Sequence, residues 1–137
     1  MVKSEIIKKK LDNGLTVIFL KNKEKRVLIH VGVRAGCLME GFDNQGVSHF
    51  VEHVLWEGSK NYPDYFTLKN EAERINANYN AFTSSRETVY YIWAARKYFV
   101  KTLHIILDVV QNPLFPVSAV EKQRKIIFNE LNQHEDR

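Results

Sequence analysis

The sequence has a single cysteine, Cys37, and no long apolar run in its 137 residues. One cysteine cannot form an internal disulfide, which agrees with a reducing compartment, and we expect Cys37 to be a small buried residue. Lys, His or Asp interrupts each longer apolar stretch, so no segment supplies the roughly 20 apolar residues of a transmembrane helix. Residues 1–10 lack the apolar core of a secretion signal and the composition of a transit peptide. We therefore expect a cytoplasmic protein without membrane contact.

Basic residues are concentrated, but nothing beside them indicates nucleic-acid binding. The net charge is +4, and basic residues gather at 8–10 and 21–26. A nucleic-acid-binding face would combine such charge with stacking aromatics or a known module, and neither is present. We interpret the charge as a solubilising surface around a hairpin and expect no nucleic-acid partner. The hydrophobic content of 45% and the length suit one globular domain with a core.

Hydrophobic periodicity switches between the two-residue period of strands and the 3.6-residue period of helices. We expect an α+β fold, with a mainly antiparallel sheet packed against helices. Asp43 or Asn44 is placed to cap the first helix, and the third helix has an apolar stripe of Phe99, Leu103, Ile106, Leu107 and Val110. The expected elements are a hairpin of strands 6–11 and 15–20 around Asn13-Gly14, a strand at 27–35, a helix between loop 36–46 and Gly58, a helix at 65–75, a β-prone segment at 81–94, a helix at 97–111, and a helix starting at the capping box Ser118-Ala119-Val120-Glu121.

The first helix carries the chemistry, because His49 and His53 are four residues apart and therefore lie on one face. At that spacing two imidazoles can bind one metal ion, and Glu52 leans over the same face. The arrangement is H-x-x-E-H, the inverted form of the H-E-x-x-H zinc-protease motif. A surface helix with two solvated histidines and a glutamate is the alternative interpretation. The opposite face is an apolar stripe of Val47, Phe50, Val51, Val54 and Leu55.

A catalytic zinc ion has three protein ligands and an open position for water, so a third ligand is needed. Glu130 is the best candidate, because it lies with Gln123 along the edge of an apolar stripe on the last helix. A carboxylate turned toward a core is costly unless it is paired or bound to metal. A partly exposed glutamate without a ligand role is the alternative. His134, one turn further on, is a competing candidate that ranks lower because it lies near the chain end.

Several motifs in a fixed order resemble one family, the pitrilysin, insulinase and processing-peptidase family of zinc endopeptidases. The likeness runs from about residue 11 to residue 131 and implies the first part of a processing-peptidase-like domain. The 76 residues between His53 and Glu130 match the family's spacing between its second histidine and its glutamate ligand. The motifs are Gly46-Val47-Ser48, His49-Phe50-Val51-Glu52-His53, Asn80-Ala81-Phe82-Thr83-Ser84, Glu87-Thr88-Val89-Tyr90-Tyr91 and Asn129-Glu130-Leu131.

The resemblance implies that His49, His53 and Glu130 hold one Zn²⁺ per chain and that Glu52 is the general base. Zinc lowers the pKa of a bound water to about 7, and a glutamate within reach can move its proton to the leaving amine. A His₂Glu site also accepts manganese or cobalt, so the metal itself stays open.

The resemblance also implies that an extended peptide substrate adds to an edge strand, where main-chain hydrogen bonds provide the affinity. An ordinary strand start is the alternative for this segment. Seven positions before the glutamate ligand the family carries an acidic residue, but Gln123 stands there. Glutamine keeps hydrogen-bonding capacity and loses the charge, so we expect weaker tuning of the metal. The residues of the expected substrate-binding strand are Asn80, Ala81, Phe82 and Thr83.

Only seven residues follow Glu130, so we expect residues 1–137 to form a single, incomplete catalytic domain. An incomplete sheet exposes edges and apolar surface, which favours self-association or a further peptidase domain or subunit as partner. The leading hypothesis is the catalytic part of a zinc metalloendopeptidase acting on peptides or unfolded segments. A non-catalytic member that binds peptides or a partner subunit is the alternative, and a structural metal site is a weaker third.

Overall fold

The computed structural model describes residues 5–135, and the side chains of residues 5–130. All strand pairs in this part of the chain are antiparallel, which confirms the expected α+β class. Short 3₁₀ helices precede α1 and α3. The strands are β1 (Glu5–Lys10), β2 (Thr16–Lys21), β3 (Arg26–Val33), β4 (Asn78–Thr83) and β5 (Thr88–Ala95). The α-helices are α1 (Val47–Leu55), α2 (Tyr65–Arg74), α3 (Phe99–Gln111) and α4 (Val117–Glu135).

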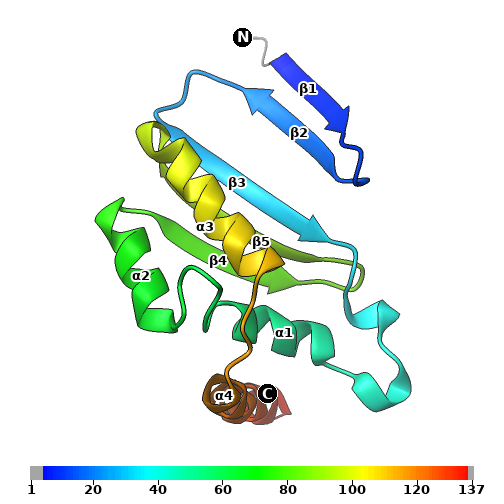
Figure 1. Ribbon diagram of the computed structural model, residues 1–137. Coiled ribbons are helices and arrows are strands. Elements are labelled where there is room, and N and C mark those ends of the chain that lie inside the picture. Colours follow the sequence, from blue (N-terminus) through cyan, green and yellow to red (C-terminus); the bar gives the residue numbers. More distant parts are fainter. Residues whose placement is uncertain (1–4, 136–137) are drawn as a thin grey trace.

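Strands β1 and β2 form the expected hairpin, which is a two-stranded sheet of its own (Figure 1). Its turn is longer than the tight two-residue turn that Asn13-Gly14 suggests. The N–H of Leu11 donates to the carbonyl of Leu15 at 2.8 Å, and the N–H of Gly14 donates to the carbonyl of Leu11 at 2.9 Å. Gly14 has φ of 87°, which only glycine adopts without strain, so the turn closes at this residue.

The second sheet has three strands in the order β3-β5-β4 (Figure 1). The β-prone segment 81–94 is therefore a hairpin, because the four polar residues from Ser84 to Glu87 separate β4 from β5. The N–H of Ser84 donates to the carbonyl of Glu87 at 2.8 Å and closes the turn. β4 starts at Asn78, earlier than expected, and its outer edge has no strand partner within residues 5–135. An edge strand is what peptide addition requires.

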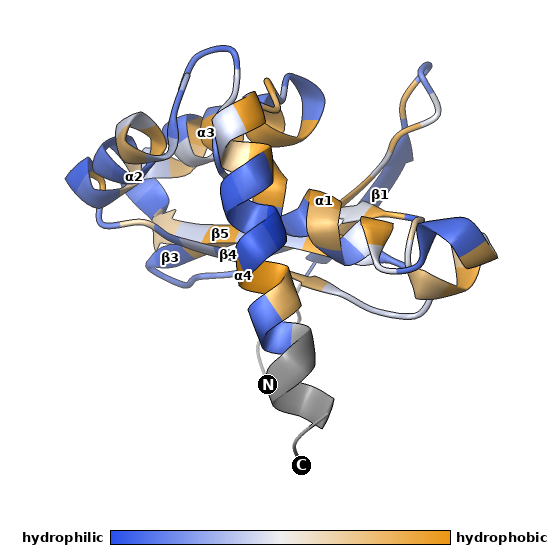
Figure 2. Cartoon of the chain, turned by 90° about the horizontal axis from the view of Figure 1, so that it is seen from below, coloured by the Kyte–Doolittle hydropathy of each residue, from blue (hydrophilic) through white to orange (hydrophobic). Residues whose placement is uncertain are grey.

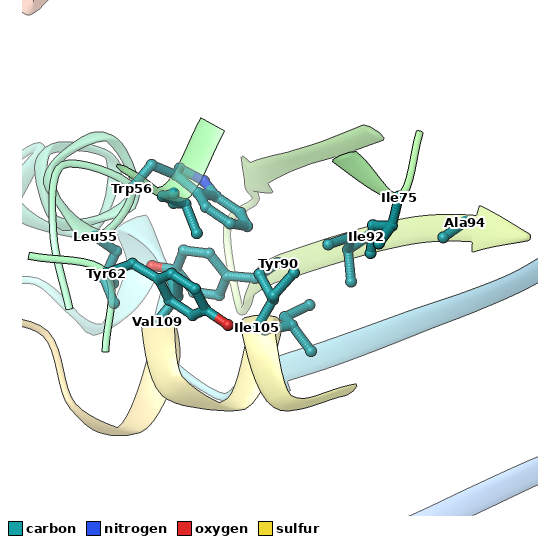
Figure 3. Close-up of a cluster of buried hydrophobic side chains, with 11 residues drawn as sticks. Leu55, Trp56, Tyr62, Ile75, Tyr90, Ile92, Ala94, Ile105 and Val109 are labelled. Carbon is teal, nitrogen blue, oxygen red and sulfur yellow. The ribbon is translucent and has the colours of Figure 1, made fainter. Parts of the chain in front are cut away.

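Helix α3 covers one face of the three-stranded sheet, and the main core lies between them (Figure 3). β5 is the most completely buried strand and is rich in β-branched and aromatic residues, which pack well on a sheet. Residues from α1, α2 and their connections close the core at its other side, so α1 is held against the sheet. The core residues are Leu55, Trp56, Tyr62, Leu68, Ile75, Tyr90, Ile92, Ala94, Ile105, Ile106 and Val109.

The buried face of α3 differs from the expected stripe, of which only Ile106 is fully buried. Thr102, Ile105 and Val109 form the buried face instead. Hydrophobic spacing did not predict this face, because it includes polar residues such as Thr102. The Thr102 hydroxyl donates to the carbonyl of Tyr98 at 2.9 Å, so its polar group is satisfied within the helix and its methyl group packs in the core.

Two further expectations, on the start of α4 and on the burial of Cys37, are wrong. α4 begins at Val117, directly after Pro116, so Ser118 lies inside the first turn and does not cap the helix. Cys37 is exposed, because the backbone of its short 3₁₀ helix, and not its side chain, packs on the β4–β5 turn. Its N–H donates to the carbonyl of Ser84 at 3.2 Å. Within residues 5–135 no helix has the length and hydrophobicity that crossing a bilayer requires.

Gly58 follows α1, but it does not end the helix through a left-handed conformation. A Cβ at this position would lie 2.7 Å from the carbonyl oxygen of Pro63, so glycine is needed for a close approach of two backbone segments. This approach fixes the segment between α1 and α2. α4 packs beside α1, and hydrophilic turns of α4 lie on both sides of a hydrophobic one (Figure 2).

Candidate metal centre

Helix α1 is fixed at its N-terminus by a carboxylate from the preceding loop. Gly46 is the N-cap with φ of 86°, and Glu40 accepts hydrogen bonds from the N–H groups of Gly46 at 2.6 Å and Ser48 at 2.8 Å. The backbone hydrogen bond from Ser48 is the main cause that lowers the pKa of Glu40. The expected caps, Asp43 and Asn44, lie in a separate 3₁₀ turn and make no cap bond. A distant glutamate therefore neutralises the free N–H groups of the helix.

The structure brings together His49, His53 and Glu130, which we call the His–His–Glu cluster. Their ligand atoms all lie within 4.8 Å of one another. The two Nε2 atoms are 3.1 Å apart, and Oε2 of Glu130 lies 3.9 Å from His49 Nε2 and 3.8 Å from His53 Nε2. Zn–N bonds of about 2.0–2.1 Å at tetrahedral angles separate two ligand atoms by about 3.3–3.4 Å. The donor set and its spacing therefore fit one zinc ion, with the carboxylate slightly too distant.

Glu52 lies beside the cluster and is buried, with 9% of its surface exposed. Its Oε2 accepts a hydrogen bond from the Thr83 hydroxyl at 2.5 Å, which ties α1 to the end of β4. The hydroxyl of Thr88 lies 3.3 Å from that of Thr83 and donates to the carbonyl of Ala35 at 2.8 Å. No described residue donates to Oε1 of Glu52, and this oxygen keeps access to solvent. One oxygen is thus held while the other is free to exchange a proton.

Gln123 lies on α4 with 8% of its surface exposed and connects the cluster to an ion pair. Its Oε1 is 3.1 Å from Nδ1 of His53, and its Nε2 donates to Glu57 at 2.5 Å. Lys122 donates to both oxygens of Glu57, at 2.8 and 3.1 Å. Glu57 and Lys122 are not among the site residues that the sequence predicts. Glu57 follows His53 by the same four residues that separate the histidines, and this spacing was the available signal.

A cavity of about 380 Å³ opens beside the cluster. The rings of Trp56 and Tyr79 form one of its walls, with centroids 4.6 Å apart. Burial, followed by the influence of Tyr65, raises the pKa of Tyr79 to about 12, so its phenol stays neutral. The cavity is thus lined by both aromatic and acidic side chains. Its lining consists of Glu52, His53, Trp56, Glu57, Tyr65, Tyr79, Asn80 and Gln123.

The four residues expected to bind substrate all lie on β4, and they divide between its two faces. Thr83 points toward α1 and contacts Glu52, whereas Phe82 is 46% exposed and lies near Tyr91 on the other face. The side chain of Asn80 accepts from the N–H of Ala81 at 2.9 Å. A peptide that pairs with this edge would compete with that bond for the same donor.

His134, the competing ligand, lies where side chains are outside the described residues. The structure therefore does not test His134 as a metal ligand.

Comparison with known proteins identifies the family. The sequence profile described as Insulinase (Peptidase family M16) matches residues 16–137. This chain belongs to that family. The family expected from the motifs is therefore confirmed. The crystal structure of pitrilysin, a protein of 24% sequence identity, superposes with a TM-score of 0.86 over 98% of this chain and 14% of that chain. This likeness shows the fold.

Two proteins of known name are similar to this chain in sequence. The cytochrome b-c1 complex subunit 1, mitochondrial, of Bos taurus is 35% identical over 91% of this chain and 26% of the relative. The probable mitochondrial-processing peptidase subunit beta of Schizosaccharomyces pombe is 36% identical over 90% of this chain and 27% of the relative. The chain therefore spans about a quarter of the length of these curated relatives. By their names, one relative is a peptidase subunit and the other is not.

Proposed function

We propose that this chain is the metal-binding, catalytic part of a zinc metalloendopeptidase that hydrolyses peptide bonds. The observation that carries the proposal is the convergence of His49 and His53 on α1 with Glu130 on α4, beside the buried Glu52. Glu130 follows His53 by 77 positions, so their proximity is a property of the fold rather than of local sequence. Membership of the insulinase family supports the same chemistry.

In this proposal His49, His53 and Glu130 hold one Zn²⁺, which supplies Lewis acidity that acidifies water and polarises a carbonyl group. Glu52 accepts the water proton at its free Oε1 and passes it to the leaving amine, as a general base and then a general acid. Thr83 donates to Oε2 of Glu52, which holds the carboxylate and leaves Oε1 available to accept that proton. The chain needs no serine or cysteine nucleophile for this reaction.

Substrate would bind as an extended strand along the free edge of β4, over Asn80, Ala81, Phe82 and Thr83. The open edge offers backbone hydrogen bonds that do not depend on the peptide's sequence. The contact of Thr83 with Glu52 supports this placement, because it puts the end of β4 beside the catalytic carboxylate. Binding would release the Asn80 side chain from the N–H of Ala81.

Zinc content of the purified chain tests the metal part of the proposal. We expect about one zinc per chain by elemental analysis after dialysis, and its loss in His49→Ala and Glu130→Ala variants. His104→Ala is the matched control, since His104 is an exposed histidine on α3, away from the cluster. Retention of zinc in both cluster variants, or none in the wild type, would refute the metal centre.

Hydrolysis of an internally quenched peptide tests the catalytic part. A Glu52→Gln variant should keep zinc and lose turnover, because an amide cannot accept the proton. The control is Glu73→Gln, which removes a carboxylate from the exposed face of α2. Activity that survives Glu52→Gln would come from elsewhere.

A second candidate is a non-catalytic member that binds a peptide or a partner subunit. It is favoured by Gln123, which stands where the family carries an acid, and by the relative that is named as a subunit of the cytochrome b-c1 complex. Under this alternative the wild type binds an extended peptide and leaves it intact, and Glu52→Gln changes neither result.

We further propose that residues 1–137 are one part of a catalytic domain that a further peptidase segment, a partner subunit or a second copy completes. The β1–β2 hairpin supports this, because apolar side chains are exposed on both of its faces, with Ile6 at 68% on one face and Ile7 at 49% on the other. Solution mass at low concentration tests self-association, and a stable monomer would refute it. A cytoplasmic location remains a prediction, which cell fractionation would test against the mitochondrial names of the two relatives.

A further inference from the structure

A buried row of polar groups leads away from His53 toward the surface. It runs from Nδ1 of His53 to Oε1 of Gln123 at 3.1 Å, and from Nε2 of Gln123 to Glu57 at 2.5 Å. Lys122 closes the row on the carboxylate of Glu57. Gln123 and Glu57 each have 8% of their surface exposed, so neither can exchange these partners freely for water. The donor and acceptor roles in one hydrogen bond therefore determine those in the next.

The Glu57 carboxylate determines which group is the donor in each hydrogen bond of this row. An ionised carboxylate accepts hydrogen bonds and cannot donate, so Gln123 must turn its NH₂ group toward Glu57. The carbonyl oxygen of Gln123 then faces His53, and a carbonyl also only accepts. Nδ1 of His53 must therefore carry the ring proton. The lone pair of the neutral ring is then on Nε2, the atom that faces His49 and Glu130.

We propose that Glu57 is a positioning residue that sets the tautomer of His53 through Gln123 and so prepares Nε2 to bind the metal. The inference deepens the proposed function and rests on it. Lys122 balances the charge of Glu57 and also lies over the ring of Tyr65, 5.3 Å from its centroid, which keeps the pair in place. Outer contacts of this kind typically change metal affinity by about 10- to 100-fold.

Reversing the ion pair is the sharpest test, because it reverses the proton directions and keeps the charges balanced. In the double variant Glu57→Lys with Lys122→Glu, the new ammonium group at position 57 can only donate. Gln123 should then turn its carbonyl toward position 57 and its NH₂ toward His53. Nδ1 of His53 becomes an acceptor, the proton moves to Nε2, and the zinc affinity should fall about 10- to 100-fold.

Adding Gln123→Glu to the reversed pair should restore both the tautomer and the affinity. A carboxylate at position 123 accepts from the new lysine and from His53 together, so Nδ1 can donate again. A merely structural role for Glu57 does not predict this rescue. The matched control reverses Glu71 and Lys101, an ion pair of 2.9 Å on α2 and α3 that does not touch the cluster.

Two readouts separate this inference from the proposed function. Long-range ¹H–¹⁵N NMR of the zinc-free chain at pH 8 reports the tautomer of His53, which is assigned by its absence in His53→Gln. Zinc affinity is measured by competition with a chromophoric chelator, and thermal unfolding shows that each variant folds. We expect the Nδ1–H tautomer in the wild type, the Nε2–H tautomer with weaker zinc binding in the reversed pair, and recovery with Gln123→Glu.

An Nε2–H tautomer in the wild type would overturn the inference, and so would an unchanged tautomer in a folded reversed pair. The wild-type spectrum decides the matter even if the reversed pair does not fold. A wild type with the Nδ1–H tautomer that binds no zinc would refute the proposed function and leave the role of Glu57 in setting the tautomer supported.

Discussion

We expect mutation of Asp108 on α3 to lower the free energy of unfolding by a large amount that depends on pH. It has 6% of its surface exposed and accepts four hydrogen bonds. Oδ2 accepts from the hydroxyl of Ser59 at 2.7 Å and the N–H of Asn61 at 2.9 Å. Oδ1 accepts from the side-chain amides of Asn61 at 2.8 Å and Asn112 at 3.1 Å. This carboxylate thus connects residues 59–61, which lie between α1 and α2, to α3.

The cost of Asp108→Asn follows from counting acceptors. Asparagine keeps one carbonyl oxygen, so two of the four hydrogen bonds lose their acceptor. The Ser59 hydroxyl can rotate and accept from the new NH₂ group, but the N–H of Asn61 cannot. Hydrogen bonds to charged groups contribute about 1.5–3 kcal/mol each. We therefore expect a loss of about 2–4 kcal/mol in the free energy of unfolding, against a typical total of about 5–15 kcal/mol.

At low pH the difference in unfolding free energy between the wild type and Asp108→Asn should disappear. Burial raises the pKa of Asp108, but the hydrogen bonds from Asn61, Ser59 and Asn112 outweigh burial and hold the pKa below its ordinary value of 3.8. Between the folded and unfolded pKa values the unfolded chain binds more protons, so the stabilisation is complete above the unfolded pKa and is lost as the pH falls through the folded pKa.

Urea unfolding followed by circular dichroism at pH 7 and at stepwise lower pH measures both effects. The control Asp43→Asn, which neutralises an exposed carboxylate, should stay within about 0.5 kcal/mol of the wild type. A variant of Asp108 as stable as this control would refute the reasoning. A difference from the wild type that persists unchanged on acidification would refute the role of the charge.

Three further predictions concern the surroundings of the cluster. Glu40→Gln should lower the unfolding free energy by about 1 kcal/mol, because it removes a charged cap from α1, and denaturant titration measures this. Thr83→Val should leave zinc content unchanged but reduce turnover about tenfold, because Glu52 loses the donor that orients it; unchanged turnover would contradict this role. Ultraviolet titration should show no difference between wild type and Tyr79→Phe below pH 11, because the pKa of Tyr79 is raised to about 12.

The local half of the candidate site could be predicted because helix geometry is short-ranged. A four-residue spacing places His49 and His53 on one face whatever surrounds the helix. The proximity of Glu130 could not be predicted from spacing, since it depends on how α4 packs against α1. The apolar stripe of the last helix made Glu130 a candidate, and the resemblance to a family supported it. Glu57 and Lys122 were missed, because they act through Gln123 and not on the cluster itself.

Two of the incorrect expectations share a physical cause, which is that polar residues can be satisfied in ways that a pattern does not show. Thr102 hides its hydroxyl in its own helix and therefore lies in the core, which rotates the buried face of α3 away from the apolar stripe. Glu40 caps α1 from outside the usual capping positions. Backbone contacts place Cys37 at the surface although cysteine is commonly buried.

Gln123 then has a different meaning from the one that sequence alone suggests. Taken by itself, glutamine at this position removes a negative charge that the family places next to a metal ligand. In the structure the buried carboxylate of Glu57 accepts a hydrogen bond from the NH₂ group of this glutamine, so the negative charge lies behind Gln123 and not in direct contact with His53. The amide transmits the acceptor character of that carboxylate to Nδ1 of His53. The departure from the family pattern is therefore no argument against metal binding by this chain.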